Sequence, residues 1–273
     1  MTGEYLTSLT PEHKKFLEEL FKDGVSFDPK VLRVYASDAS LLTGTVLAMV
    51  RPENAAQLCE FMRWAEEQHV AVHPRGRGTS LSGGCVPTVP GIVVSMLGMD
   101  KIIEISKQDF VAVVEPGVNT ALLQAECEKL GMFYPPDPAS GKATSIGGNV
   151  ITCAGGLRAV KYGVTRDYVL GVEAVLPGGQ LMTFGGRTHK DVIGLDLGRL
   201  FVGSEGTLGI VTKLVLKLLP KPEASASVLV GYPSLDAALA SMGKVFAAGI
   251  LPCAVEFMNE TVLEILTKTG EVP

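Results

Sequence analysis

The chain has 273 residues, of which 47% are hydrophobic and 19% charged, a composition typical of a soluble enzyme with an ample core. Its net charge of -5 at pH 7 argues against a nucleic-acid partner, because nucleic-acid-binding proteins usually present a basic face. No apolar run approaches the roughly 18 residues that span a bilayer, and the first residues, MTGEYLTSLTPEHKK, lack the apolar core of a secretory signal. We therefore expect a cytoplasmic protein without a transmembrane segment.

The cysteines are scattered along the chain and form no CxxC pair. They are Cys59, Cys85, Cys127, Cys153 and Cys253. An odd number without close spacing indicates a reducing compartment and no zinc or iron–sulfur site built from cysteines alone.

Capping residues and apolar spacing predict helices in the first part of the chain. These are 11–22 with Thr10 as N-cap, Pro29–Tyr35, 53–69, 120–130 with Asn119 as N-cap, and 146–151 with Ser145 as N-cap. Strands are predicted at Val46–Val50, 70–72, 92–96, 101–105, Val111–Val114, 169–176, 181–184 and 207–219. The turn PGGQ at 177–180 predicts a hairpin between two of them, and 197–202 is predicted as a helical turn.

The segment KPEAS at 221–225 is predicted to be a linker. A β-α-β pattern follows, with a strand at 228–232, a helix at Leu235–Ala247, a strand at 254–258 and the start of another helix. One and a half β-α units cannot close a core of their own. We therefore expect a first domain over residues 1–220 and an incomplete second domain over residues 221–273.

Two glycine-rich loops follow predicted strands: PRGRGTSLSGG at 74–84 and PPDPASGKATSIGGNVITCAGG at 135–156. Glycine adds no side chain to a core, so a backbone that passes very close to a ligand explains these loops better than packing does. Converging backbone N–H groups suit a pyrophosphate. The N-terminus of the short helix after Ser145 would offer further free N–H groups to an anion. Arg75 and Arg77 could add charge or could simply face solvent, and each loop taken alone could be a mere turn.

Two better-known phosphate motifs do not fit the first loop. A Rossmann site needs GxGxxG between a strand and a long helix, but Leu81 stands where the third glycine would be, and strands follow. A Walker A loop needs GxxxxGK[ST], which the chain lacks. Both interpretations are rejected.

Five ordered segments resemble the FAD domain of the vanillyl-alcohol oxidase / p-cresol methylhydroxylase superfamily. They are PRGRGTSLSGG, YPPDPAS, SIGGNVITCAGG, RAVKYGVTRDYVLGVEAVLPGG and FVGSEGTLGIVTKLVLKLLP. The branch that they resemble most contains the glycolate oxidase FAD subunit, D-lactate dehydrogenase and D-2-hydroxyglutarate dehydrogenase. The resemblance implies an α+β fold in which two α+β subdomains enclose the flavin, followed by the start of a ferredoxin-like substrate (cap) domain.

The resemblance also implies which residues bind FAD. The pyrophosphate loop would comprise Arg75, Gly76, Arg77, Gly78, Thr79, Ser80 and Leu81. The ribityl and pyrophosphate region would contact Asp137, Pro138 and Ser140, and the cradle would be completed by Ser145, Ile146, Gly147, Gly148 and Asn149. Thr152 and Gly155 would lie near the isoalloxazine ring, and the adenosine end would be lined by Glu205, Gly206, Ile210 and Val211.

Three positions depart from the family pattern. Members that attach FAD covalently carry histidine in the first loop where this chain has Thr79, so noncovalent FAD is implied. Cys153 stands where relatives commonly have asparagine, and a buried small thiol explains it better than a flavin-linked or redox thiol. Leu195 replaces a tyrosine that is frequent in this branch.

The sequence names no catalytic base. Oxidation of a 2-hydroxy acid needs a group that accepts the hydroxyl proton, but His13, His69, His73 and His189 are better explained as solvated or structural residues. No two of them stand at metal-ligand spacing, so no metal site is expected. The related dehydrogenases carry a histidine-rich metal and catalytic motif farther along than this chain extends.

The resulting hypothesis is an FAD-dependent oxidoreductase that oxidises a small D-2-hydroxy acid, such as glycolate or D-lactate, by hydride transfer to flavin N5. Its electron acceptor would be a protein or a quinone. Two alternatives stay open: a non-catalytic FAD or electron-transfer subunit of a larger complex, and a different reaction on the same FAD fold.

Overall fold

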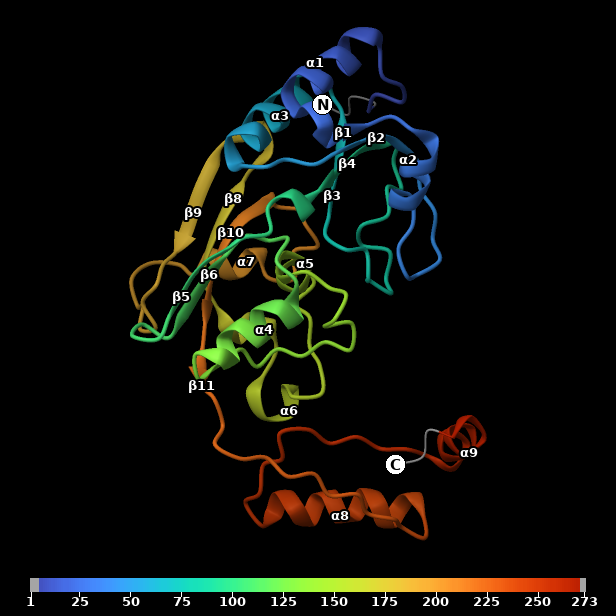
Figure 1. Ribbon diagram of the computed structural model, residues 1–273, viewed down its shortest axis with the longest axis vertical. Helices are drawn as coiled ribbons and strands as arrows, with labels where there is room; N and C mark the ends of the chain where they lie inside the picture. Colours follow the sequence, from blue (N-terminus) through green and yellow to red (C-terminus); the bar gives the residue numbers. More distant parts are fainter. Residues whose placement is uncertain (1–4, 271–273) are drawn as a thin grey trace.

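The computed structural model describes residues 5–270 as two α+β subdomains, each with its own sheet and apolar core, followed by a helical C-terminal segment (Figure 1). The predicted α+β class and the two subdomains are confirmed. Across the described residues, no helix combines the length and the apolar character needed to cross a membrane.

The first subdomain contains a four-stranded sheet with the order β1-β2-β4-β3. Its elements are α1 (Pro11–Phe21), η1 (Lys22–Gly24), β1 (Val25–Ser26), α2 (Pro29–Tyr35), β2 (Val46–Val50), α3 (Ala55–Glu67), β3 (Ala71–Arg75), β4 (Gly91–Ser95) and η2 (Met96–Gly98). β2, β4 and β3 run parallel, and β1 is antiparallel to β2. Leu17 of α1 and Leu58 and Phe61 of α3 are completely buried in the core of this subdomain, so both helices turn their apolar faces inward.

The second subdomain contains a five-stranded antiparallel sheet with the order β5-β6-β10-β8-β9. Its strands are β5 (Ile102–Ser106), β6 (Val111–Val114), β8 (Val169–Val175), β9 (Leu181–Gly185) and β10 (Ile210–Lys217), with a small pair β7 (Met132–Phe133) and β11 (Leu219–Pro220). Its helices are α4 (Thr120–Lys129), α5 (Ile146–Ile151), α6 (Ala159–Tyr162), η3 (Thr165–Tyr168), η4 (Pro177–Gly179) and α7 (Gly198–Phe201). Leu123, Ile146 and Val150 pack with Leu214 and Leu216 of β10, so α4 and α5 share one core with the sheet.

The two subdomains are joined by the turn between β8 and β9. Gly178 and Gly179 both have left-handed backbones, with φ of 79° and 77°, and a Cβ on Gly179 would collide with the carbonyl oxygen of Cys59 in α3. The turn therefore lies directly on the backbone of that helix. Val175 and Ile210, at the adjoining ends of β8 and β10, are buried in the core of the first subdomain.

Most predicted elements are confirmed within one or two residues. The long strand expected from Thr207 begins at Ile210 instead, because the chain turns first, with the Thr207 amide donating to the Ser204 carbonyl at 3.0 Å. β7, β11 and α6 had not been predicted, since two to four residues carry no periodic signal.

The strands predicted at 228–232 and 254–258 are wrong. Both segments pair with no strand in the part of the chain that the structure describes, and Val228 and Leu229 are 84% and 68% exposed. A strand requires a neighbouring edge that accepts its backbone hydrogen bonds, and none lies beside these segments. The predicted helix α8 (Leu235–Ala247) is confirmed and α9 (Glu260–Thr269) follows, with no buried residue in either.

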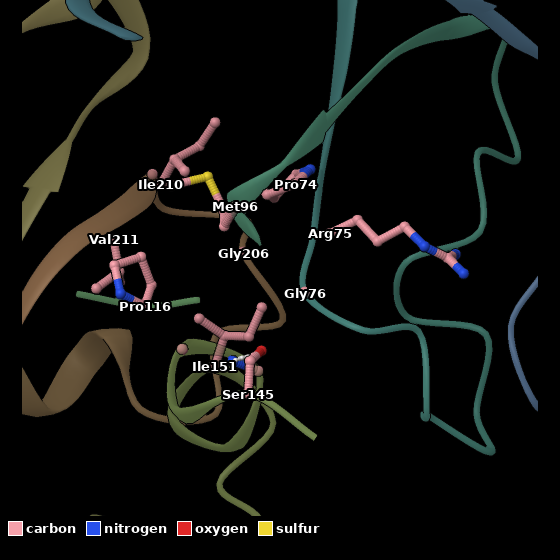
Figure 2. Close-up of a pocket in the computed structure, with 13 residues that line it drawn as sticks. Pro74, Arg75, Gly76, Met96, Pro116, Ser145, Ile151, Gly206, Ile210 and Val211 are labelled. Carbon is pink, nitrogen blue, oxygen red and sulfur yellow. Dashed lines mark hydrogen bonds between the residues drawn. The ribbon is translucent and has the colours of Figure 1, made fainter. Parts of the chain in front are cut away.

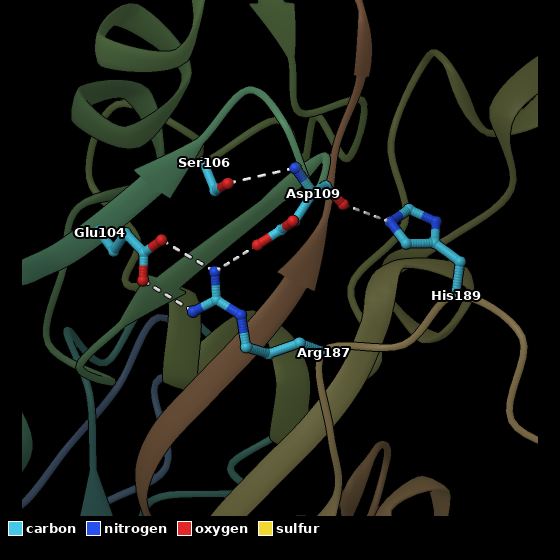
Figure 3. Close-up of polar contacts among 5 residues, drawn as sticks. All are labelled: Glu104, Ser106, Asp109, Arg187 and His189. Atoms are coloured by element: carbon cyan, nitrogen blue, oxygen red, sulfur yellow. Dashed lines mark hydrogen bonds and ion pairs between the residues drawn. The ribbon is translucent and has the colours of Figure 1, made fainter.

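The chain after β9 is fastened by an ion-pair cluster (Figure 3). Arg187 donates to both carboxylate oxygens of Glu104 in β5, at 2.7 and 2.8 Å, and to Asp109 in the β5–β6 turn at 2.8 Å. A ring nitrogen of His189 lies 2.9 Å from the Asp109 carbonyl oxygen. Since β5 and β9 are the opposite edges of the sheet, this cluster links the chain after one edge strand to the other edge strand.

We predict that Gly179→Ala lowers the free energy of unfolding by roughly 2–5 kcal/mol, because left-handed strain and a collision with α3 add together. Gly131→Ala is the matched control, since Gly131 also has a positive φ but nothing within 4 Å of its Cβ position; strain alone should cost roughly 1–2 kcal/mol. Urea titrations of both variants give the comparison. Equal losses would contradict the contact between the turn and α3.

We predict that Arg187→Met lowers the melting temperature at pH 7 by no more than about 4 °C, since the three side chains are partly exposed. Hydrogen bonds from Arg187 lower the pKa of Glu104 and of Asp109. Their contribution is therefore present above the ordinary carboxyl pKa of about 4 and is lost as the pH falls through the lowered values. In thermal melts from pH 7 to pH 3, the melting temperatures of wild type and of Arg187→Met should become equal in acid. Arg199→Met, which removes a local pair with Asp196, is the control.

Candidate functional site

A pocket lies where three segments from both subdomains meet (Figure 2). The end of β3 supplies residues of the first glycine loop, α5 and its cap supply the second wall, and the chain leading into β10 supplies the third. The lining residues are Pro74, Arg75, Gly76, Met96, Pro116, Ser145, Gly147, Gly148, Ile151, Gly206, Gly209, Ile210 and Val211. The pocket thus joins the two sheets and depends on their relative placement.

The three walls approach each other so closely that glycine is required at the contacts. A Cβ on Gly76 would lie 2.5 Å from the Ser145 hydroxyl oxygen, and one on Gly206 would lie 2.7 Å from a ring carbon of Pro74. A Cβ on Gly147 would lie 2.5 Å from Pro116. Real Cβ atoms do not approach other atoms this closely, so each glycine permits a close contact between two segments.

The short helix α5 does not offer the free N–H groups that its sequence led us to expect. The amide of Ile146 donates to the Val118 carbonyl and that of Gly147 to the Pro116 carbonyl, both at 2.8 Å. The Gly148 amide donates to the Ser145 hydroxyl at 3.4 Å, as predicted for an N-cap. The chain after β6 lies against the start of α5 and uses these amides, which the sequence pattern alone could not reveal.

The third wall is held against the other end of α5. The Gly203 amide donates to the Val150 carbonyl at 3.0 Å, and the Glu205 amide donates to the Ile151 carbonyl at 2.8 Å. Glu205 and Cys153 both have left-handed backbones, with φ of 54° and 49°. Cys153 is half-buried rather than fully buried, and its backbone is the kind that asparagine tolerates better than cysteine.

The structure brings together some of the residues that the sequence predicted and leaves others outside the pocket. Those in its lining are Arg75, Gly76, Ser145, Gly147, Gly148, Gly206, Ile210 and Val211. Those outside the lining are Arg77, Gly78, Thr79, Ser80, Leu81, Asp137, Pro138, Ser140, Ile146, Asn149, Thr152, Gly155 and Glu205.

Several residues outside the lining are engaged elsewhere. Asp137 forms an ion pair with Arg158 at 3.3 Å. Asn149 is 2% exposed; its amide nitrogen donates to the Thr120 hydroxyl at 2.8 Å, and its carbonyl oxygen accepts from the Thr144 hydroxyl at 3.0 Å. Asn149 therefore ties α5 to Thr120 and Thr144, because a buried amide is stable only when it is hydrogen-bonded. Leu195, which replaces a tyrosine that is frequent in this branch, is 84% exposed.

The FAD-binding residues expected from the sequence did not include five residues of the pocket lining: Pro74, Met96, Pro116, Ile151 and Gly209. Arg75 and Met96 mark the carboxyl ends of the parallel neighbours β3 and β4. Ligands of parallel sheets commonly bind at the carboxyl ends of strands, so this rule could have identified Met96. Pro116 has no such signal, because only the tertiary fold places it beside α5.

The pocket contains groups suited to binding and lacks groups suited to proton transfer. Ser145 and Arg75 carry the only hydroxyl and the only charged group among the lining side chains, and no carboxylate lines the pocket. The Nε2–H of His73 donates to the Val89 carbonyl oxygen at 2.9 Å, and burial lowers the pKa of its imidazole. None of the chain's histidines lines the pocket.

The pocket lies at the strand ends between two α+β subdomains, and its glycine-rich, carboxylate-free lining suits the phosphate of a nucleotide cofactor. The sequence model of the family described as FAD binding domain matches residues 46–185, and that of the family described as FAD linked oxidases, C-terminal domain, matches residues 221–273. The chain belongs to the FAD binding domain family.

Curated relatives agree with this family. The chain is 45% identical over 225 residues to glycolate oxidase subunit GlcD of Bacillus subtilis, covering 82% of this chain and 48% of that protein. It is 35% identical to D-lactate dehydrogenase of Anaerostipes hadrus, covering 96% and 56%, and 36% identical to D-2-hydroxyglutarate dehydrogenase of Stutzerimonas stutzeri, covering 83% and 48%. The chain therefore spans about half the length of these relatives.

A solved structure of alkyldihydroxyacetonephosphate synthase shares the fold, with a TM-score of 0.77 at 21% identity, covering 93% of this chain and 48% of that one. The residues present fit FAD, the cofactor that the family implies. Five glycines and the Ser145 hydroxyl line the pocket, and no carboxylate lies there to repel a pyrophosphate.

We predict that Gly76→Ala weakens FAD binding and lowers the free energy of unfolding by roughly 1–3 kcal/mol, because the new methyl group separates β3 from Ser145. Gly186→Ala is the control, since a Cβ there meets nothing within 4 Å and the backbone φ is not positive. Flavin fluorescence titration and urea unfolding measure the two effects. A Gly76→Ala variant that binds FAD as tightly as wild type would show that the close contact between Gly76 and Ser145 is dispensable.

Proposed function

We propose that the protein is an FAD-dependent oxidoreductase that oxidises a small D-2-hydroxy acid, such as glycolate or D-lactate, to the corresponding 2-oxo acid. The observation that carries this proposal is the 45% identity to a glycolate oxidase subunit, over a stretch that contains every wall of the pocket. The names of the D-lactate and D-2-hydroxyglutarate dehydrogenases support the same substrate class.

We assign FAD binding to the residues identified from the family resemblance, with the pocket as its centre. The first loop, Gly76 to Leu81, would contact the pyrophosphate, and Ser145, Gly147 and Gly148 would form the opposing wall. Glu205, Gly206, Ile210 and Val211 would line the adenosine end. The ribityl and pyrophosphate region would contact Asp137, Pro138 and Ser140, and Thr152 and Gly155 would lie near the ring. Thr79, in place of histidine, supports noncovalent attachment.

Bound FAD would supply the acceptor for the hydride that leaves the α-carbon of the substrate. The chain's own residues would bind and orient the cofactor, and the apolar side chains of Met96, Ile151 and Ile210 would exclude water from it. We assign no proton-transfer role to a residue of this chain, because no histidine and no carboxylate lines the pocket.

We further propose that residues 1–220 form the FAD domain and that residues 221–273 begin the substrate (cap) domain, with a ferredoxin-like fold. The match of a separate C-terminal family from residue 221 supports this boundary. We place the protein in the cytoplasm, with a protein or quinone as electron acceptor.

A second candidate function is that of an FAD or electron-transfer subunit within a larger complex. The Bacillus subtilis relative is a subunit of glycolate oxidase, which favours this function, as does a pocket without a proton acceptor. The fold shared with alkyldihydroxyacetonephosphate synthase keeps a different reaction on the same FAD fold as a third possibility.

We predict that the purified chain retains or takes up FAD, and that anaerobic addition of glycolate, D-lactate or D-2-hydroxyglutarate to the protein bleaches the visible flavin band if the substrate site is present. L-lactate is the control for stereochemistry. A protein that takes up no flavin after reconstitution would contradict FAD binding. Flavin that binds but is bleached by none of the acids would favour the electron-transfer subunit.

A further inference from the structure

Arg75 is placed differently from the other residues of the first glycine loop. It is the last residue of β3, and its side chain points away from the pocket toward the far side of the loop (Figure 2). Only 7% of the residue is exposed, although a guanidinium is among the groups that are most costly to bury. A buried charge of this kind requires specific partners.

The partners of Arg75 come from α2, from the segment after it and from the far end of the loop. Nη1 donates to the sulfur of Cys85 at 3.3 Å, and the guanidinium carbon lies 5.5 Å from the centre of the Tyr35 ring. The Cys85 thiol in turn donates to Asp38 at 3.9 Å. Within residues 5–270, Arg75 forms no ion pair, and the neutral thiol of Cys85 stands between it and the Asp38 carboxylate.

The thiol keeps its proton in this arrangement. Burial is the largest cause that raises the pKa of Cys85, and Asp38 raises it further, whereas Arg75 lowers it. Because the thiol is protonated near pH 7, it can accept from Arg75 and donate to Asp38 at the same time.

The loop itself closes over the guanidinium. Gly78 has a φ of 66°, and a Cβ at that position would collide with Nη2 of Arg75. The backbone between Gly76 and Gly78 therefore wraps around the Arg75 side chain, and the shape of the loop depends on that side chain being in place.

We propose that Arg75 is a positioning residue: it holds the first glycine loop from behind through Tyr35 and Cys85, instead of neutralising the phosphates of the cofactor. This proposal rests on the FAD binding described above. It changes the role that the sequence suggested for Arg75 from electrostatic contact to control of backbone shape.

An electrostatic role and a positioning role of Arg75 differ in whether a lysine can take over the role. Lysine keeps the charge, so Arg75→Lys would preserve an electrostatic role. It lacks the planar guanidinium that stacks on an aromatic ring and donates in a fixed direction, so it cannot replace the positioning role.

The test compares the affinity for FAD and the order of the loop in Arg75→Met, Arg75→Lys and the control Arg33→Met, which removes one exposed charge from the neighbouring helix α2. Titration of the flavin-free 273-residue chain with FAD gives the dissociation constant. Both Arg75 variants should bind about tenfold more weakly or worse, and the control should match wild type.

The rate of trypsin cleavage in the flavin-free proteins measures how well the first glycine loop is ordered when FAD is absent. Arg77 is exposed within it, so the fragment that begins at Gly78 should appear faster in both Arg75 variants than in wild type. Full affinity in the lysine variant, unchanged affinity in the methionine variant, or an unchanged cleavage rate would each overturn the positioning role.

Cys85→Ala provides a second variant if Arg75→Met does not fold, as judged by its melting curve. It removes no charge, yet it should also weaken FAD binding and speed cleavage at Arg77, because Arg75 loses its hydrogen-bond partner and keeps only the Tyr35 ring. Wild-type behaviour in Cys85→Ala would overturn the proposal. If wild-type protein itself takes up no FAD, the proposed function fails, which is a separate outcome from any difference among the variants.

Discussion

The structure depends on backbone segments that touch without side chains between them. Gly179 sets the β8–β9 turn on α3, Gly76 sets the end of β3 against Ser145, and Gly206 sets the chain before β10 against Pro74. The first contact joins the subdomains, and the other two form the walls of the pocket. The same kind of contact therefore holds the subdomains together and shapes the site.

The chemical character of the pocket follows from those contacts. Segments this close leave space only for glycine and for small or apolar side chains, so the walls offer backbone, one hydroxyl and hydrophobic surface. Such a lining binds and shields a cofactor but holds no proton acceptor. The one charged residue of the lining, Arg75, packs its guanidinium on the Tyr35 ring instead.

Much of the fold was predictable from the chain. The capped helices at Thr10, Asn54, Asn119 and Ser145 have local signals, since a polar side chain before an apolar run satisfies the first amides of a helix. The two strands expected near 228–232 and 254–258 failed because strand formation requires a partner edge, which alternation along one segment cannot supply. Two-residue strands such as β7 are too short to leave any pattern.

The sequence by itself determined the family, the two glycine loops and eight of the lining residues, which it named as cofactor-binding, because these features depend on local residue types and spacing. Only the tertiary structure decided which way each residue faces. It directed the Arg75 side chain out of the pocket, assigned the first amides of α5 to Val118 and Pro116, and brought Met96 and Pro116 to the walls. These outcomes depend on segments distant in the chain competing for the same space and the same hydrogen bonds.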